Sequence, residues 1–289
     1  MEQILSNPHF KVVRFHQKSA EIFDNVDIKG GVAIGYYDSE REFGPIGFFS
    51  EYKDLKNILN KVLQHPSFTR GGLANIVSSQ GIYRFSELAI SEVPAILKVQ
   101  GKGTAAKIVS QSVEKLPTVF YLTKPKDGRD YIQILGLVNN QRGYRWIRRD
   151  YIQPVDSLDS YKVLVPEANG TGAIGEVLST PVIGVPVIGV PVIGHTDTFL
   201  SIGKFASAEE ASACLKYVKT KFARCMLGTL KATQHNPKST WANVPLLDFT
   251  SESDIDWSQS VADIDRQLYA KYGLSEDEIA FIESMIKPM

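Results

Sequence analysis

The sequence predicts an α+β fold, in which a mixed or antiparallel sheet has flanking helices and is followed by a helical C-terminal tail. Runs rich in β-branched and aromatic residues, such as FKVVRF at 10–15 and YIQILGLV at 131–138, alternate with segments whose apolar residues recur at helical spacing. With 289 residues, 43% of them hydrophobic and 22% charged, the chain is typical of a globular protein of one or two domains.

The N-terminal part is predicted to form a strand pair and then a helix. FKVVRF and VAIGYY (32–37) are the strands, and the turn-rich IFDNVDIKGG connects them. The segment 47–64 changes to helical spacing, with Ser50 as its expected N-cap. The apolar face of this helix consists of Leu55, Ile58, Leu59 and Val62.

The middle of the chain is predicted to be rich in strands. TVFYLTKP and YIQILGLV are expected to pair as a β-hairpin, because Asp127-Gly128 between them is a strong turn signal. NNQRGYRWIRRDY (139–151) is expected to extend this sheet, and FLSIGKF (199–205) to add a strand.

Two helices are predicted with their caps in the C-terminal third. The segment 207–233 is the clearest helix, and Ser207 and Glu210 form its expected capping box. Ser275 and Glu278 are expected to cap a helix of the tail in the same way.

An apolar pentad is repeated shortly before the strand FLSIGKF. PVIGV occurs twice at 181–190, and PVIG begins a third copy that ends at His195 and Thr196. A period of five fits neither a helix nor a strand, and proline removes a backbone donor in every copy. The repeat is therefore predicted to be an extended connection that lies partly against the body of the protein.

Composition narrows the functional classes. No run approaches the roughly 18 apolar residues of a membrane span, and no secretory signal is evident, so the expected compartment is the cytoplasm. Two cysteines, Cys214 and Cys225, are too few for a disulfide scaffold. The net charge is zero, but residues 251–289 carry nine acidic and three basic residues, which leaves a basic body of net charge +6. Such a body is compatible with binding to a polyanion.

The most informative local pattern is NNQRGYRWIRRDY. Guanidinium groups bind guanine or phosphate, amides pair with adenine, and aromatic rings stack on bases. The alternative is a solvated hairpin whose arginines pair with carboxylates. The candidate DNA contacts are Asn139, Asn140, Gln141, Arg142, Tyr144, Arg145, Arg148 and Arg149.

Patterns for metal or nucleotide chemistry are weak. No His or Cys pair has the spacing of metal ligands, so no metal site is predicted. GTGAIG at 170–175 lacks the Gly-Lys-Ser/Thr that ends a phosphate-binding loop. Asp27 and Lys29 form the D-x-K pattern of many metal-dependent nucleases, but hydrolysis there needs further converging carboxylates.

Several segments together carry a family resemblance. They are IFDNVDIKGGVAIGYYD (22–38), PVIGHTDTFLSIGKF, STWANVPLLDF (239–249) and the tail segment 257–288. The first is similar to the stretch that closes the catalytic domain of fused restriction–modification N6-adenine DNA methyltransferases (Type IIG and relatives). The others resemble the C-terminal target-recognition region of the same enzymes.

The resemblance implies three parts: a terminal hairpin of a methyltransferase-like domain (1–45), a DNA target-recognition domain (46–250) and an acidic helical tail (251–289). The family's methyl-donor motif F-x-G-x-G and its catalytic NPPY are absent from this chain. S-adenosylmethionine is therefore expected in a catalytic partner or in a preceding part of the enzyme, not here. His195 and Thr196 would be placed against double-stranded DNA by the length of the repeat.

Three hypotheses stay open from the sequence. The chain is a non-catalytic DNA-recognition module, or a restriction endonuclease subunit that cuts DNA with a metal ion at Asp27 and Lys29, or a module that only docks other subunits through its tail. Specific DNA binding, magnesium-dependent cleavage and absence of duplex binding distinguish the three.

Overall fold

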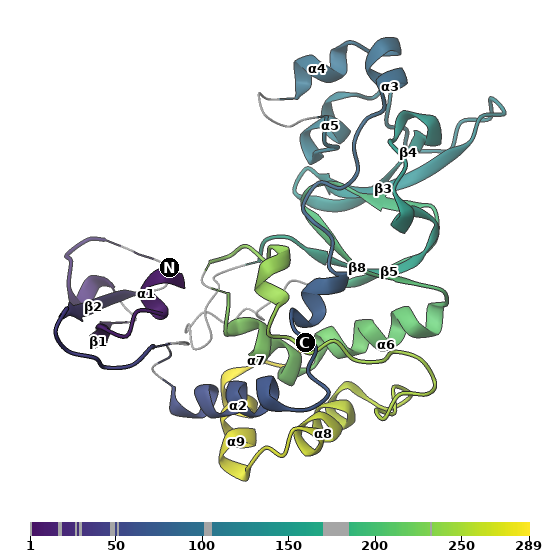
Figure 1. Cartoon of the computed structure of the whole chain (residues 1–289). Helices are drawn as coiled ribbons and strands as arrows, with labels where there is room; N and C mark the ends of the chain where they lie inside the picture. The colour runs from purple at the N-terminus through teal and green to yellow at the C-terminus, as the bar shows by residue number, and fades with distance from the viewer. Residues whose placement is uncertain are drawn as a thin grey trace.

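The computed structural model describes residues 2–16, 19–26, 28, 31–46, 50, 52–100, 106–169, 185–231 and 233–289. Within this part of the chain, nine α-helices and eight strands in three small sheets form an α+β fold, as predicted. Figure 1 shows a small N-terminal hairpin, a helical body and an upper lobe. Short 3₁₀ helices, labelled η, connect several of the elements.

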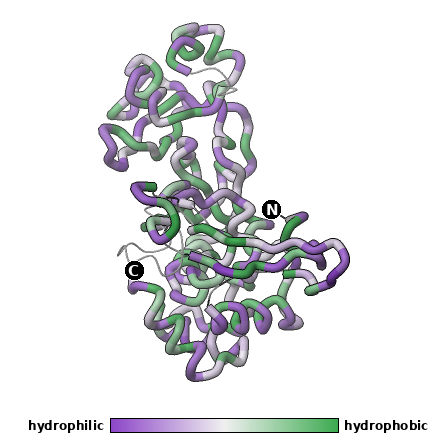
Figure 2. Tube along the Cα trace, turned by 90° about the vertical axis from the view of Figure 1, so that its left-hand side faces the viewer, coloured by the Kyte–Doolittle hydropathy of each residue, from purple (hydrophilic) through white to green (hydrophobic). Residues whose placement is uncertain are grey.

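The N-terminal hairpin stands apart from the buried core. Its strands β1 (Phe10–His16) and β2 (Val32–Tyr37) pair antiparallel, preceded by α1 (Glu2–Leu5) and joined through η1 (Ser19–Glu21). None of its described residues belongs to the three buried apolar clusters of the protein. Figure 2 nevertheless shows apolar stretches along the hairpin.

The body is an antiparallel sheet covered by helices. The sheet has the order β6-β5-β8, and η2 (Gly72–Ile76) and η5 (Lys238–Trp241) pack near it. The largest apolar core lies between this sheet and the helices. The strands are β5 (Tyr161–Pro166), β6 (Val187–Gly189) and β8 (Phe199–Phe205), and the helices are α2 (Lys53–Gln64), α6 (Ala208–Lys219), α7 (Lys221–Gly228), α8 (Val261–Lys271) and α9 (Glu276–Met285).

The predicted helices of the body are present, with two corrections. The predicted apolar face of α2 is buried, but the helix begins at Lys53, and Ser50 accepts the backbone N–H of Tyr52 at 3.1 Å instead of capping it. The long helix predicted over 207–233 is two helices, because the backbone at Thr220 is extended. The Thr220 hydroxyl accepts the N–H of Ala223 and so caps α7.

The C-terminal tail is part of the body core. Its capping box of Ser275 and Glu278 is present as predicted. Ile264 and Ile282, from α8 and α9, are fully buried in the cluster that also contains α2, α6 and α7. Asp265 of α8 accepts the first two backbone N–H groups of α7, each at 2.9 Å.

The upper lobe has its own sheet and core. The sheet has the order β4-β3-β7, with β3 (Tyr131–Val138) and β4 (Gln141–Arg148) antiparallel and β7 (Ile193–His195) parallel to β3. Ile132, Ile134 and Ile147 of this sheet are fully buried. The remaining elements are α3 (Glu87–Glu92), α4 (Ala95–Val99), α5 (Ser110–Lys115), η3 (Arg149–Tyr151) and η4 (Asp156–Asp159).

The hairpin of the upper lobe does not turn where the sequence predicted. β3 pairs with β4 through a turn at Asn139 and Asn140, whereas the segment before Asp127-Gly128 contributes one isolated bridge, from Tyr121 to β4. The prediction of a hairpin around Asp127-Gly128 is therefore wrong. In the described part of the chain, no helix has both the length and the apolar character needed to cross a membrane.

Candidate nucleic-acid interface

The turn of the β3–β4 hairpin carries two of the predicted DNA contacts. Asn139 and Asn140 have φ of 50° and 60°, in the left-handed region. A two-residue hairpin turn of this kind needs positive φ at both positions, and asparagine tolerates that conformation better than most residues. Turn geometry thus explains why asparagines stand here. Their exposed amides remain at the end of the hairpin.

Strand β4 is buried at its C-terminal end and exposed near the turn. Ile147, near the far end of β4, is fully buried, whereas Gln141 and Tyr144 are exposed. Arg145 is half-buried, and its guanidinium donates to the backbone carbonyl of Tyr144 at 2.9 Å. No ion pair holds Arg145 among the described residues, so its charge is available to a ligand.

Arg142 connects the hairpin to the body. Its guanidinium donates to the backbone carbonyl of Val185 and lies over the ring of Phe199, 5.5 Å from the ring centroid. Burial lowers the pKa of Arg142. These contacts make Arg142 a structural link between the hairpin and the segment before β6, although the residue remains partly open to solvent.

Arg148 is held by carboxylates inside the upper lobe. It is 8% exposed and pairs with Glu92 at 2.6 Å and with Asp150 at 2.7 Å. It also donates to the hydroxyl of Tyr151 at 3.0 Å. The hydrogen bonds to these carboxylates, first that to Asp150, raise the pKa of Arg148. The donors of Arg148 are thus occupied inside the upper lobe, as in the alternative of an arginine paired with carboxylates.

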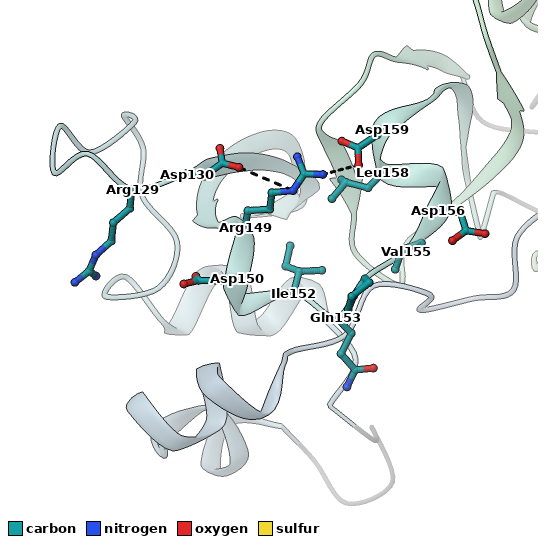
Figure 3. A pocket seen from close by; sticks show the side chains of 11 residues that line it. Arg129, Asp130, Arg149, Asp150, Ile152, Gln153, Val155, Asp156, Leu158 and Asp159 are labelled. Carbon is teal, nitrogen blue, oxygen red and sulfur yellow. Dashed lines mark hydrogen bonds and ion pairs between the residues drawn. The ribbon is translucent and has the colours of Figure 1, made fainter.

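Arg149 lies on the wall of an acidic cavity of about 560 Å³. Figure 3 shows its guanidinium between Asp130 and Asp159, with which it forms ion pairs. Asp150 and Asp156 also line this cavity. Because aspartates outnumber arginines on its wall, the cavity disfavours phosphate. Arg149 is thus an arginine paired with carboxylates, as in the alternative to DNA contact given by the sequence.

His195 and Thr196, two of the predicted DNA contacts, are both fully buried, so neither side chain is accessible to DNA in this structure. The ring of His195 lies edge-on to Tyr83, with the centroids 4.9 Å apart, and its Nδ1 donates to the backbone carbonyl of Thr196. Burial lowers the pKa of His195 to about 4. The Thr196 hydroxyl shares hydrogen bonds with Ser110 and Thr198. The parallel pairing of β7 with β3 places His195 opposite Leu135.

The second copy of the pentad repeat is extended, as predicted, whereas the third begins with a turn at Pro191 and Val192, where Val192 has a φ of 60°. The second copy forms β6, which pairs with β5 in the body, and the third forms β7 in the upper lobe. Both are edge strands, where a proline is tolerated. A Cβ on Gly194 would come within 2.8 Å of Ile134, so its glycine permits close strand packing. The first copy, at 181–184, and GTGAIG at 170–175 lie outside the described residues.

The predicted nuclease pair is not placed by the structure. Asp27 and Lys29 lie outside the described residues. Within the part of the chain that is described, no group of three or more His, Cys, Asp or Glu side chains could hold a metal ion.

Sequence reasoning missed a second polar surface beside β4. Tyr121 and Trp146 exchange two backbone hydrogen bonds of 2.8 Å, which attaches the loop 122–130 to the outer edge of the hairpin. Lys124 lies over the indole ring of Trp146, 5.5 Å from its centroid. The two lysines of K-P-K (124–126) were visible in the sequence. The turn signal Asp127-Gly128, however, predicted that this segment pairs with β3 and not with β4.

No protein-family model, curated protein or solved structure matches this chain.

Proposed function

We propose that this chain is a DNA target-recognition module of an N6-adenine restriction–modification enzyme. It binds duplex DNA for a catalytic domain that carries the S-adenosylmethionine site. The segments 22–38 and 239–249 and the tail support this proposal by their resemblance to the ends of such enzymes. The observation that carries it is the exposed end of the β3–β4 hairpin. This end presents amides and a guanidinium without an ion pair, while the opposite end of the hairpin is buried in the core of the upper lobe.

The hairpin has the shape and chemistry for groove binding. The major groove of duplex DNA admits a two-stranded β-ribbon, and amide side chains pair there with adenine. Asn139, Asn140 and Gln141 supply amides at the tip, and Arg145 supplies the donors that guanine or phosphate accepts. Arg142 bonds to Val185 and Arg148 pairs with Glu92, and these contacts fix the hairpin to the rest of the protein. Its exposed end would therefore meet DNA as a pre-organised surface.

The N-terminal hairpin is the proposed docking surface for the catalytic domain. Nine of the 18 exposed large hydrophobic side chains of the described chain lie within residues 2–46, on α1, on both strands and on their connection. A single two-stranded hairpin is marginally stable at best in water. Both outer edges of β1 and β2 also lack a neighbouring strand among the described residues. Addition of the hairpin to a sheet of the catalytic domain would cover its apolar faces and pair an open edge.

The test begins with selection of a bound sequence from a duplex library with a randomised centre. On the enriched duplex, Gln141→Ala and Arg145→Ala are expected to weaken binding by about 1–3 kcal/mol each and to relax specificity at one position. Arg266→Ala, which removes an exposed charge from α8, is the control and is expected to bind like the parent. Parent-like binding by both hairpin variants would contradict the proposed interface.

Two further measurements separate the competing hypotheses. Incubation of the enriched duplex with magnesium leaves it uncut if the chain is a recognition module, whereas cleavage that Asp27→Ala abolishes would favour the endonuclease. Calorimetry with S-adenosylmethionine is expected to show no binding by this chain. A chain that binds no duplex at moderate salt would favour the docking-only hypothesis.

A further inference from the structure

The most exposed large hydrophobic side chain in the described structure is Leu122, at 75%. It begins the loop 122–130, LTKPKDGRD, which leaves the edge of β4 and returns to β3. Burial of a leucine is worth about 1.5–3 kcal/mol, and Leu122 contributes almost none of this to the fold. The side chain is thus free for a partner.

The backbone before Leu122 is fixed, and the loop is anchored again at Asp127. Tyr121 is hydrogen-bonded to Trp146 in both directions, and its hydroxyl donates to the carbonyl of Thr118 at 2.7 Å. At the other end of the loop, the Asp127 carboxylate accepts the hydroxyl of Tyr131 at 2.9 Å. Leu122 is therefore presented by a frame anchored at both ends.

Cationic residues follow this leucine in the same loop. Lys124 and Lys126 are exposed, and Lys126 makes no hydrogen bond or ion pair with any described residue. Arg129 is more than half exposed and pairs with Asp127 at 3.8 Å, and Figure 3 shows its guanidinium at the edge of the acidic cavity, apart from Arg149. An apolar side chain flanked by cations is the pattern of DNA-bending proteins that insert a wedge between base steps.

We propose that Leu122 inserts between stacked base pairs of the bound duplex while Lys124 and Lys126 bind the flanking phosphates. This inference rests on the proposed function, since it assumes that the partner is duplex DNA. Separation of one base step costs a few kcal/mol, and the phosphate contacts and the buried leucine offset that cost. A step opened in this way also lowers the cost of extruding a base toward a catalytic domain.

The experiment uses the full chain and the enriched duplex in which 2-aminopurine replaces one adenine at a time. The fluorescence of this base rises when it is unstacked. The parent is expected to raise it at one step, and Leu122→Ala is expected to lose most of that rise and to bind about tenfold more weakly. Leu97→Ala is the matched control, because Leu97 is also an exposed leucine of the upper lobe, on α4.

A second duplex distinguishes a wedge from a structural role. On a duplex with a mismatch at the same step, stacking is already weakened, so Leu122→Ala is expected to regain affinity close to that of the parent. The double variant Lys124→Gln, Lys126→Gln is expected to reduce the slope of log K against log salt by about 2. Parent-like fluorescence and affinity of Leu122→Ala would overturn the wedge alone. A parent chain that binds no duplex would overturn the proposed function with it.

Discussion

The N-terminal hairpin is rich in apolar side chains and lies outside the buried apolar clusters, whereas the acidic C-terminal tail is packed into the body. In the hairpin, Val13 and Tyr37 are more than half exposed. In the tail, Ile282 and Leu268 have no exposed surface. The content of apolar or charged residues therefore does not decide which end joins the core of this protein.

The difference lies in periodicity and in complementary partners. Apolar residues of α8 and α9 recur at helical spacing and form one buried stripe. Those of β1 and β2 lie on both faces of a two-stranded sheet, and none of them is buried in the described part of the chain. The tail's charge is also matched by the body. Lys61 pairs with Glu278 at 2.7 Å, and Lys216 donates to three consecutive tail carbonyls.

The sharpest test of this comparison is removal of each end. Truncation before residue 251 strips buried side chains from the main core and is expected to unfold the body, because the loss exceeds the roughly 5–15 kcal/mol of net stability of a typical domain. Removal of residues 1–46 is expected to shift the melting temperature of the rest by less than about 2 °C. Thermal melts followed by circular dichroism measure both. A cooperatively folded chain without the tail would break the comparison.

Single substitutions repeat the test on a smaller scale. Ile282→Ala opens a cavity in the main core and is expected to cost about 2–5 kcal/mol. Ile34→Ala, at a 44% exposed position of β2, is expected to cost less than about 0.5 kcal/mol. Urea unfolding of the two variants against the parent gives both values. Equal losses would show that the hairpin is packed in solution.

The pH dependence of Asp265 tests how the tail is attached. Burial raises the pKa of this carboxyl to about 6, above its ordinary value of 3.8. Between these values the folded protein holds a proton that the unfolded chain releases, so Asp265 favours folding more as the pH falls from about 6 to about 4. The parent should therefore gain up to about 3 kcal/mol relative to Asp265→Asn between pH 7 and pH 4.

The difference in unfolding free energy between the parent and Asp265→Asn cancels the contributions of the other titrating groups. A difference between the parent and Asp265→Asn that stays constant from pH 7 to pH 4 would contradict the raised pKa.

The pentad repeat is partly packed, unlike the exposed hairpin and the buried tail. Removal of one copy is expected to have the smallest effect on stability. Removal of either complete PVIGV copy gives the same sequence, and the remaining PVIGV and PVIG can still form β6 and β7. The melting temperature is therefore expected to stay within about 2 °C of the parent. Removal of two copies deletes one edge strand and should cost about 2 kcal/mol or more. Equal melting of all three chains would show that neither strand contributes to stability.

The sequence alone determined the features that depend on neighbours along the chain. The apolar face of α2, the capping box at Ser275 and the extended form of the second pentad copy follow from local spacing, hydrogen bonding and proline content. The α+β class follows from the same patterns. Each of these features is determined by interactions among residues close in the sequence, so the sequence alone is sufficient to predict it.

Tertiary structure decided which polar groups are available and where the chain turns. Arg148 is buried because Glu92, 56 residues earlier, comes within 2.6 Å, and His195 is buried because β7 pairs with β3. The break at Thr220 likewise depends on Asp265, which accepts the N–H groups exposed at the start of α7. Buried donors and acceptors must find partners, and here those partners come from distant elements that no local pattern reveals.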